Sequence, residues 1–91
     1  MKKPAAMSSE YEAELQRIAD AVASLAGLTD AEIDNQVDRT WLISRRIDEA
    51  GFRDLWIRCN AIFLLAARQH PTDPTLVAAI DDLWRLLYRE W

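Results

Sequence analysis

Two side chains in this sequence, Cys59 and His70, have the chemistry of a nucleophile and a base. A thiol and an imidazole within hydrogen-bond reach can catalyse acyl transfer, because the imidazole takes the proton of the thiol. Here, however, Cys59 falls on an apolar helix face with Phe52 and Phe63, where a thiol packs as a small hydrophobic group. His70 stands at the end of the same predicted helix, where an imidazole suits the helix dipole. The pattern therefore favours structural roles for both residues.

The sequence lacks the other common signatures of catalysis and ligand binding. It has no Gly-x-Ser-x-Gly turn and no glycine-rich loop. Asp30, Glu32 and Asp34 alternate along a predicted helix, so their carboxylates diverge rather than converge on a metal ion. No Glu-x-x-His motif follows the acidic pairs at i and i+4. We therefore predict a protein that is not an enzyme and that has no metal, no cofactor and no catalytic residue.

A group of arginines in the middle of the chain suggests nucleic-acid binding. The group consists of Arg39, Arg45, Arg46, Arg53 and Arg58. Two helices with arginines on the second one would form a helix-turn-helix-like regulator, which is the alternative function that the sequence offers. Acidic residues are interleaved with these arginines, and the whole chain has a net charge of −4. Because phosphate neutralisation supplies most of the affinity for nucleic acids, this charge weighs against the alternative.

Aromatic residues near the end of the chain exceed what a small core requires. Trp84, Tyr88 and Trp91 recur at i, i+4 and i+7, so they share one edge of a helix. These rings can cover the core or they can face a partner, and Trp, Tyr and Arg are the most common hot-spot residues of protein interfaces. The candidate partner-binding residues are Trp84, Arg85, Tyr88, Arg89 and Trp91, with Arg45 and Arg46 as a second, polar group.

Helices must position all these residues, because apolar side chains recur at helical spacing along the chain. Five apolar residues of the first segment follow a 4-3-4-3 spacing that predicts one narrow stripe, which Ala19 and Ala26 flank. They are Tyr11, Leu15, Ile18, Val22 and Leu25. The third and fourth segments are apolar over more of their surface than one contact face requires, which favours a central position or an interface.

Turn signals divide the chain into four segments. Gly27 and Gly51 are each suited to end a helix. Residues 29–32, Thr-Asp-Ala-Glu, match a capping box that begins a helix, and Asp73-Pro74 combines an N-cap with a proline at the first helical position. Pro71 ends the segment before it, because the residue preceding a proline avoids helical geometry. We predict helices at residues 9–26, 30–50, 52–69 and 74–90.

Short connections favour antiparallel neighbours, so the predicted fold class is all-α, a small four-helix up-down bundle. A three-helix core with the first or last helix exchanged into a partner is the alternative. Residues 1–8 are expected to be a flexible N-terminal extension, and residues 9–91 a single bundle domain. No apolar run approaches the ~18–20 residues of a membrane span. A single cysteine excludes an internal disulfide and fits a reducing compartment, so we expect a cytoplasmic protein without a membrane partner.

These observations predict a small, acidic, non-enzymatic module that binds another protein. Inhibitors, immunity proteins, antitoxins and phage- or plasmid-encoded anti-defence proteins share this profile, which suggests a bacterial or phage origin. The expected mechanism is occlusion, in which a preformed helical face covers a functional surface of the partner. We also expect a homodimer, because a two-fold contact would bury the spare apolar surface of the third and fourth segments.

Overall fold

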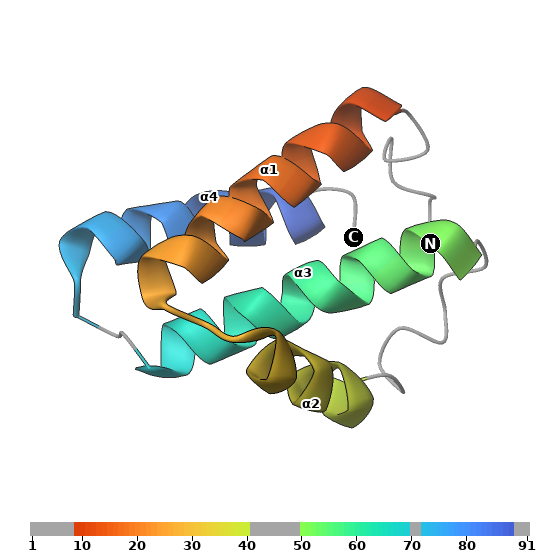
Figure 1. Cartoon of the computed structure of the whole chain (residues 1–91). Coiled ribbons are helices and arrows are strands. Elements are labelled where there is room, and N and C mark those ends of the chain that lie inside the picture. Colours follow the sequence, from red (N-terminus) through yellow and green to blue (C-terminus); the bar gives the residue numbers. More distant parts are fainter. Residues whose placement is uncertain (1–8, 41–49, 70–71, 89–91) are drawn as a thin grey trace.

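The structure, a computed structural model, describes residues 9–40, 50–69 and 72–88, and these ranges are almost entirely helical (Figure 1). The four helices are α1 at Ser9–Ala26, α2 at Asp30–Thr40, α3 at Ala50–Gln69 and α4 at Pro74–Tyr88. The described ranges contain no strand. The predicted fold class, a small all-α bundle of four helices, is therefore confirmed.

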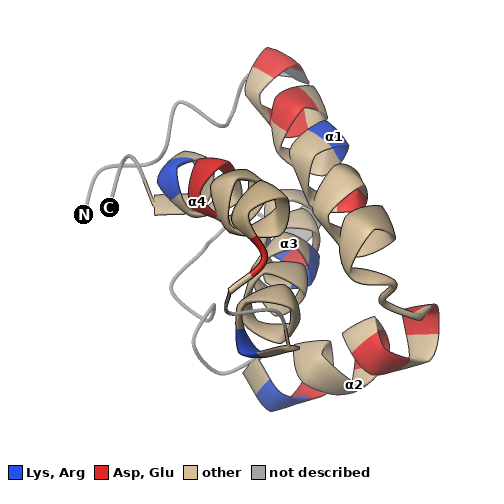
Figure 2. Ribbon diagram, turned by 90° about the vertical axis from the view of Figure 1, so that its left-hand side faces the viewer, with Lys and Arg blue, Asp and Glu red and all other residues tan. Residues whose placement is uncertain are grey.

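The central helix is α3, which packs against each of the other three. α1 and α4 also pack against each other, so α1, α3 and α4 enclose the core within one chain. α1 and α3 run in the same direction and α4 returns in the opposite one (Figure 1). α2 departs from a regular up-down arrangement, since it lies across α3 (Figures 1 and 2). Its contact face is short, with Ile33, Gln36 and Thr40 as its buried residues.

The core follows the predicted apolar stripes with one shift on α1. Tyr11, Leu15 and Val22 are buried as expected, but Leu25 has 57 % of its surface exposed, and Ala19 and Ala26 are buried. An α-helix drifts by about 20° per heptad relative to a strict 3.5-residue repeat. Over two heptads this drift carries position 25 out of the contact. The predicted stripe is therefore wrong at Leu25, and the alanines take its place.

Three of the predicted helix ends are formed by the expected contacts. Gly27 has a φ of +68°, and its N–H donates to the Ser24 carbonyl at 3.2 Å. The next N–H, that of Leu28, donates to the Ala23 carbonyl at 3.0 Å, and the pair of bonds makes a Schellman motif. At the start of α2, the Thr29 N–H donates to Glu32 Oε1 at 3.0 Å and the Glu32 N–H to Thr29 Oγ1 at 3.1 Å. The predicted capping box is confirmed.

At the start of α4, the Leu76 N–H donates to Asp73 Oδ1 at 3.2 Å, so Asp73 is the N-cap of this helix. Pro74 is the first helical residue, as predicted. These local contacts set the point at which α4 begins.

The prediction that Gly51 separates two helices is wrong. Ala50 and Gly51 both belong to the first turn of α3. A glycine ends a helix only where the chain turns left-handed, whereas Gly51 has helical geometry inside α3. The predicted second helix is confirmed over Asp30–Thr40, whereas residues 41–49 lie outside the described ranges. None of the described helices combines the length and the hydrophobicity needed to cross a membrane.

Candidate functional site

The described candidate residues of the aromatic segment lie on one edge of α4. Val77 and Trp84 have 42 % and 48 % of their surface exposed, although the inner face of the same helix is buried. Asp81 and Arg85 are exposed beside them, and Tyr88 is partly buried. We call these five residues the α4 edge. Trp91, Arg89, Arg45 and Arg46, which the sequence also nominates, lie outside the described residues.

Tyr88 belongs partly to the core. Its hydroxyl donates to Asn60 Oδ1 at 2.8 Å, and its ring meets the ring of Trp56 edge-on, with centroids 5.5 Å apart and an interplanar angle of 82°. Burial raises the pKa of the Tyr88 hydroxyl, so it remains a hydrogen-bond donor at neutral pH. Asn60 itself is only 2 % exposed. The one signal in the sequence for this partner is an amide among the apolar residues of α3.

Trp84 rests against Tyr88, with ring centroids 6.0 Å apart and a tilt of 35°. The partly buried ring of Tyr88 therefore supports an indole that projects beyond the core. This arrangement separates the two roles left open by the sequence, since Tyr88 joins the edge to α3 and Trp84 presents the exposed aromatic surface.

The last turn of α4 is held by side chains of two other helices. The carbonyl groups of a last helical turn have no partners within the helix. The Trp56 Nε1–H donates to the Leu87 carbonyl at 3.2 Å, and the Tyr11 hydroxyl donates to the Leu86 carbonyl. Both donors come from the core-facing sides of α1 and α3. They fix the end of α4 that carries Trp84 and Tyr88.

One ion pair lies along the α4 edge. Arg85 Nε lies 3.0 Å from Asp81 Oδ2, one turn earlier in the same helix. Both side chains are well exposed, and an exposed pair at i and i+4 contributes only about 0.3–0.5 kcal/mol. Figure 2 shows the acidic and basic bands next to each other on α4. Val77 shares the predicted stripe of Trp84 and Tyr88, seven residues before Trp84, but neither Val77 nor Asp81 was among the residues nominated for partner binding.

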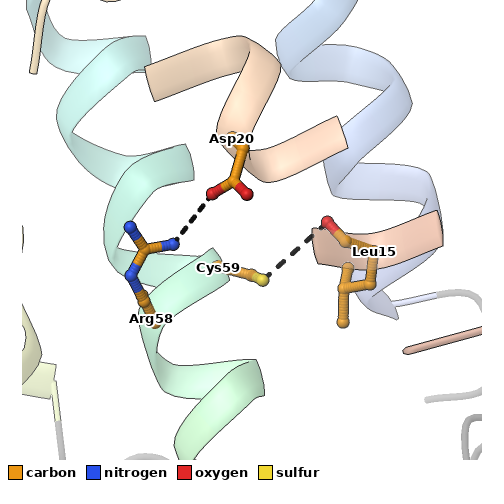
Figure 3. A network of polar contacts seen from close by, with 4 residues as sticks. All are labelled: Leu15, Asp20, Arg58 and Cys59. Atoms are coloured by element: carbon orange, nitrogen blue, oxygen red, sulfur yellow. Dashed lines mark hydrogen bonds and ion pairs between the residues drawn. The ribbon is translucent and has the colours of Figure 1, made fainter. Parts of the chain in front are cut away.

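Cys59 lies inside the bundle, where its Sγ contacts the Leu15 carbonyl oxygen at 3.9 Å (Figure 3). The side chain is fully buried, and desolvation raises the pKa of the thiol to about 12. The thiol is therefore protonated at neutral pH and is not a nucleophile. Its predicted placement among apolar side chains is confirmed.

The described arginines of the central group are divided between α2 and α3. Arg58 Nη1 lies 3.1 Å from Asp20 Oδ1 on α1 (Figure 3). Arg39 is exposed on α2, and Arg53 is partly buried on α3. Beyond the group, Arg68 Nη2 donates to Gln36 Oε1 at 3.4 Å. The guanidinium groups of Arg58 and Arg68 thus join α3 to α1 and to α2, respectively.

The described part of the chain contains no cluster of three or more His, Cys, Asp or Glu side chains that could hold a metal ion. Comparison with protein-family models, with curated proteins and with solved structures gives no match.

Proposed function

We propose that this protein is a small non-enzymatic binding module whose α4 edge covers a functional surface of another protein. The observation that carries the proposal is Trp84, an indole with 48 % of its surface exposed on a helix end that two other helices hold in place. Tryptophan is enriched among the few residues that supply most of the binding energy of protein interfaces.

Preorganisation supports this role for Trp84. Ordering a side chain on binding costs about 0.5–1.5 kcal/mol, and a ring already held by its neighbours loses less. Trp84 leans on Tyr88, and Tyr88 is fixed by Asn60 and Trp56. Arg85 stands beside the indole and is exposed, so it can exchange Asp81 for an acidic group of the partner.

Occlusion of a partner is the mechanism that this arrangement favours. A rigid helical edge that carries out no reaction acts by covering a surface of its partner, as inhibitors, immunity proteins, antitoxins and phage or plasmid anti-defence proteins do. A chain with a single cysteine forms no internal disulfide, which supports a reducing compartment, the cytoplasm, for this interaction. A second copy of this chain is also a candidate partner for the same edge.

Replacement of Trp84 tests the proposal. Trp84→Ala should weaken partner binding by about 2 kcal/mol or more, roughly thirtyfold in Kd. It should lower the free energy of unfolding by only about 1 kcal/mol, because the indole is half exposed and loses one ring contact. The partner is first identified by affinity purification from the native host, and binding is then measured by calorimetry with the purified partner.

Leu25→Ala is the matched control, because Leu25 is a large exposed apolar residue on α1 that lies outside the α4 edge. It should leave partner binding unchanged. Equal binding by the wild type and Trp84→Ala would overturn the proposal, as would a Trp84→Ala variant that no longer folds, since the indole would then belong to the core.

A further inference from the structure

Two copies of the α4 edge are complementary in charge when their helices run antiparallel. Asp81 stands one turn before Arg85, and Trp84 lies between them along the chain. When two such helices lie antiparallel, the acidic position of one faces the basic position of the other. A parallel arrangement would place Arg85 beside Arg85 and Asp81 beside Asp81.

A two-fold axis at the level of residue 83 gives each Asp81 and each Arg85 an oppositely charged neighbour and brings the two Trp84 rings together. In a two-fold contact the same surface of both subunits meets, so each pairing occurs twice. The two Trp84 rings then meet close to the axis, at the centre of the contact, where hot-spot residues are typically found. On either side of the rings, Arg85 of each copy faces Asp81 of the other, about 3 Å along the helix from the axis at ~1.5 Å per residue.

We propose that a second copy of this chain docks on the α4 edge in this antiparallel, two-fold arrangement. The dimer covers Trp84, so it competes with any other protein for the same surface. That competition rests on the proposed function, whereas the dimer itself does not. Free protein at high concentration is therefore self-occluded, and dilution releases the binding surface.

Charge reversal tests the pairing through the mass of the particle in solution. Light scattering should show twice the 10.5 kDa chain mass for the wild type. Asp81→Arg and Arg85→Asp should each weaken dimerisation by about tenfold or more, because each places like charges opposite one another twice. The Asp81→Arg/Arg85→Asp double variant should dimerise again, since the exchanged charges still face their opposites.

Arg17→Asp is the matched control. Arg17 forms the same kind of exposed intrahelical pair, with Glu14 on α1, outside the α4 edge. Its loss should leave dimerisation unchanged. A wild-type mass of 10.5 kDa at millimolar concentration would overturn the proposal, as would an equal effect of Arg17→Asp and Arg85→Asp.

Disulfide trapping tests the orientation. An Asp81→Cys chain mixed with a tagged Arg85→Cys chain should form the mixed disulfide faster than either chain forms a disulfide with itself. A parallel dimer would reverse that order, which would overturn the antiparallel arrangement. Cys59 does not interfere, because it is buried and its thiol pKa is raised to about 12. The native chain therefore needs no prior cysteine replacement.

The two proposals fail in different ways. If the wild type is monomeric and Trp84→Ala still loses the partner found in the host, the dimer is wrong and the binding function stands. If the wild type forms the trapped dimer and Trp84→Ala keeps that partner, the binding function is wrong at this surface and the dimer stands.

Discussion

At the scale of single residues, Tyr88 and Trp84 are neighbours on α4 with different environments. Tyr88 is anchored through its hydroxyl to Asn60, whose side chain is almost wholly enclosed. Trp84 is anchored only through its ring. A buried amide needs its hydrogen bond, because an unsatisfied polar group in an apolar interior is costly. The Tyr88–Asn60 bond is thus the polar link that sets the position of the aromatic pair.

Removal of this hydroxyl gives a residue-scale prediction. Tyr88→Phe should lower the free energy of unfolding by about 1–3 kcal/mol, because it leaves the buried Asn60 carbonyl without its donor. Urea unfolding followed by circular dichroism measures the loss. The Asn60→Leu/Tyr88→Phe double variant should recover part of it, since neither polar group then remains. Equal stability of Tyr88→Phe and the wild type would show that water satisfies Asn60.

At the scale of elements, α2 is held differently from the other helices. Of its three buried residues only Ile33 is apolar, and Gln36 and Thr40 are polar. Two side-chain bonds tie it to α3: Gln36 accepts from Arg68 at 3.4 Å, and Glu32 accepts from Gln69 at 3.2 Å. α1, α3 and α4 supply most of the apolar core, to which α2 adds only Ile33 and the partly buried Val37. We therefore expect α2 to open before the rest of the bundle does.

The two helix N-caps provide a matched test of that order. Thr29→Ala and Asp73→Ala should each destabilise their own helix by about 1 kcal/mol. In hydrogen exchange, Thr29→Ala should speed exchange within α2 and leave α1, α3 and α4 nearly unchanged. Asp73→Ala should lower protection throughout α1, α3 and α4, because α4 is part of their common core. A uniform effect of Thr29→Ala on all four helices would show that α2 unfolds together with the core.

Acid weakens the capping box at the start of α2. The backbone N–H of Thr29, followed by the amide of Gln69, holds the pKa of Glu32 below its usual value. A lowered carboxyl pKa stabilises the folded state at neutral pH, and that contribution is lost as the pH falls through the folded-state pKa. The start of α2 therefore loosens in acid, because protonation weakens the carboxylate half of the capping box, whereas Thr29→Ala removes its hydroxyl half.

At the scale of the whole molecule, the charge is divided unevenly between the two halves. α1 and α2 carry eight acidic residues against Arg17 and Arg39, whereas α3 and α4 carry three acidic residues against four arginines (Figure 2). On α2, Asp30, Asp34 and Asp38 follow one another at i, i+4 and i+8, and all three are exposed. Like charges at this spacing repel, and each pair costs about 0.2–0.5 kcal/mol.

Salt should therefore stabilise this protein. Screening of the two pairs on α2 is worth about 0.5 kcal/mol, so raising the ionic strength from about 0.01 M to 0.5 M should raise Tm by roughly 2–4 °C. Asp34→Asn removes both pairs and should flatten this dependence. Asp82→Asn, an exposed aspartate on α4, is the control and should keep it. A Tm that falls with salt would show that attractive pairs such as Arg58–Asp20 outweigh the repulsion.

Local contacts were predictable because the residues that form them are close in the chain. The Schellman motif at Gly27, the capping box of Thr29 and Glu32, and the N-cap at Asp73 each join residues three to five positions apart. The residue types alone specify such bonds. The same reasoning failed at Gly51, because a glycine suits both a helix end and a first helical turn, and the choice depends on packing beyond the turn.

The candidate site was predictable only in part for the same reason. Spacing brought Trp84, Arg85 and Tyr88 to one edge of α4, but it could not divide them between core and surface. That division depends on two residues of α3 that are distant in the chain. Asn60 bonds Tyr88, 28 residues away, and Trp56 bonds the Leu87 carbonyl, 31 residues away. The exposure of Val77 and Trp84 became known only with the packing of the inner face of α4.

The amino-acid sequence by itself determined four amphipathic helices, three of their ends and the buried, inert setting of Cys59, because each follows from spacing and short-range bonds. The packing of the helices decided the rest: that α2 lies across α3, and that Trp84 projects while Tyr88 is anchored. These outcomes depend on which helix faces meet. A helix with a wide apolar face can pack in more than one orientation, and its neighbours decide which one it takes.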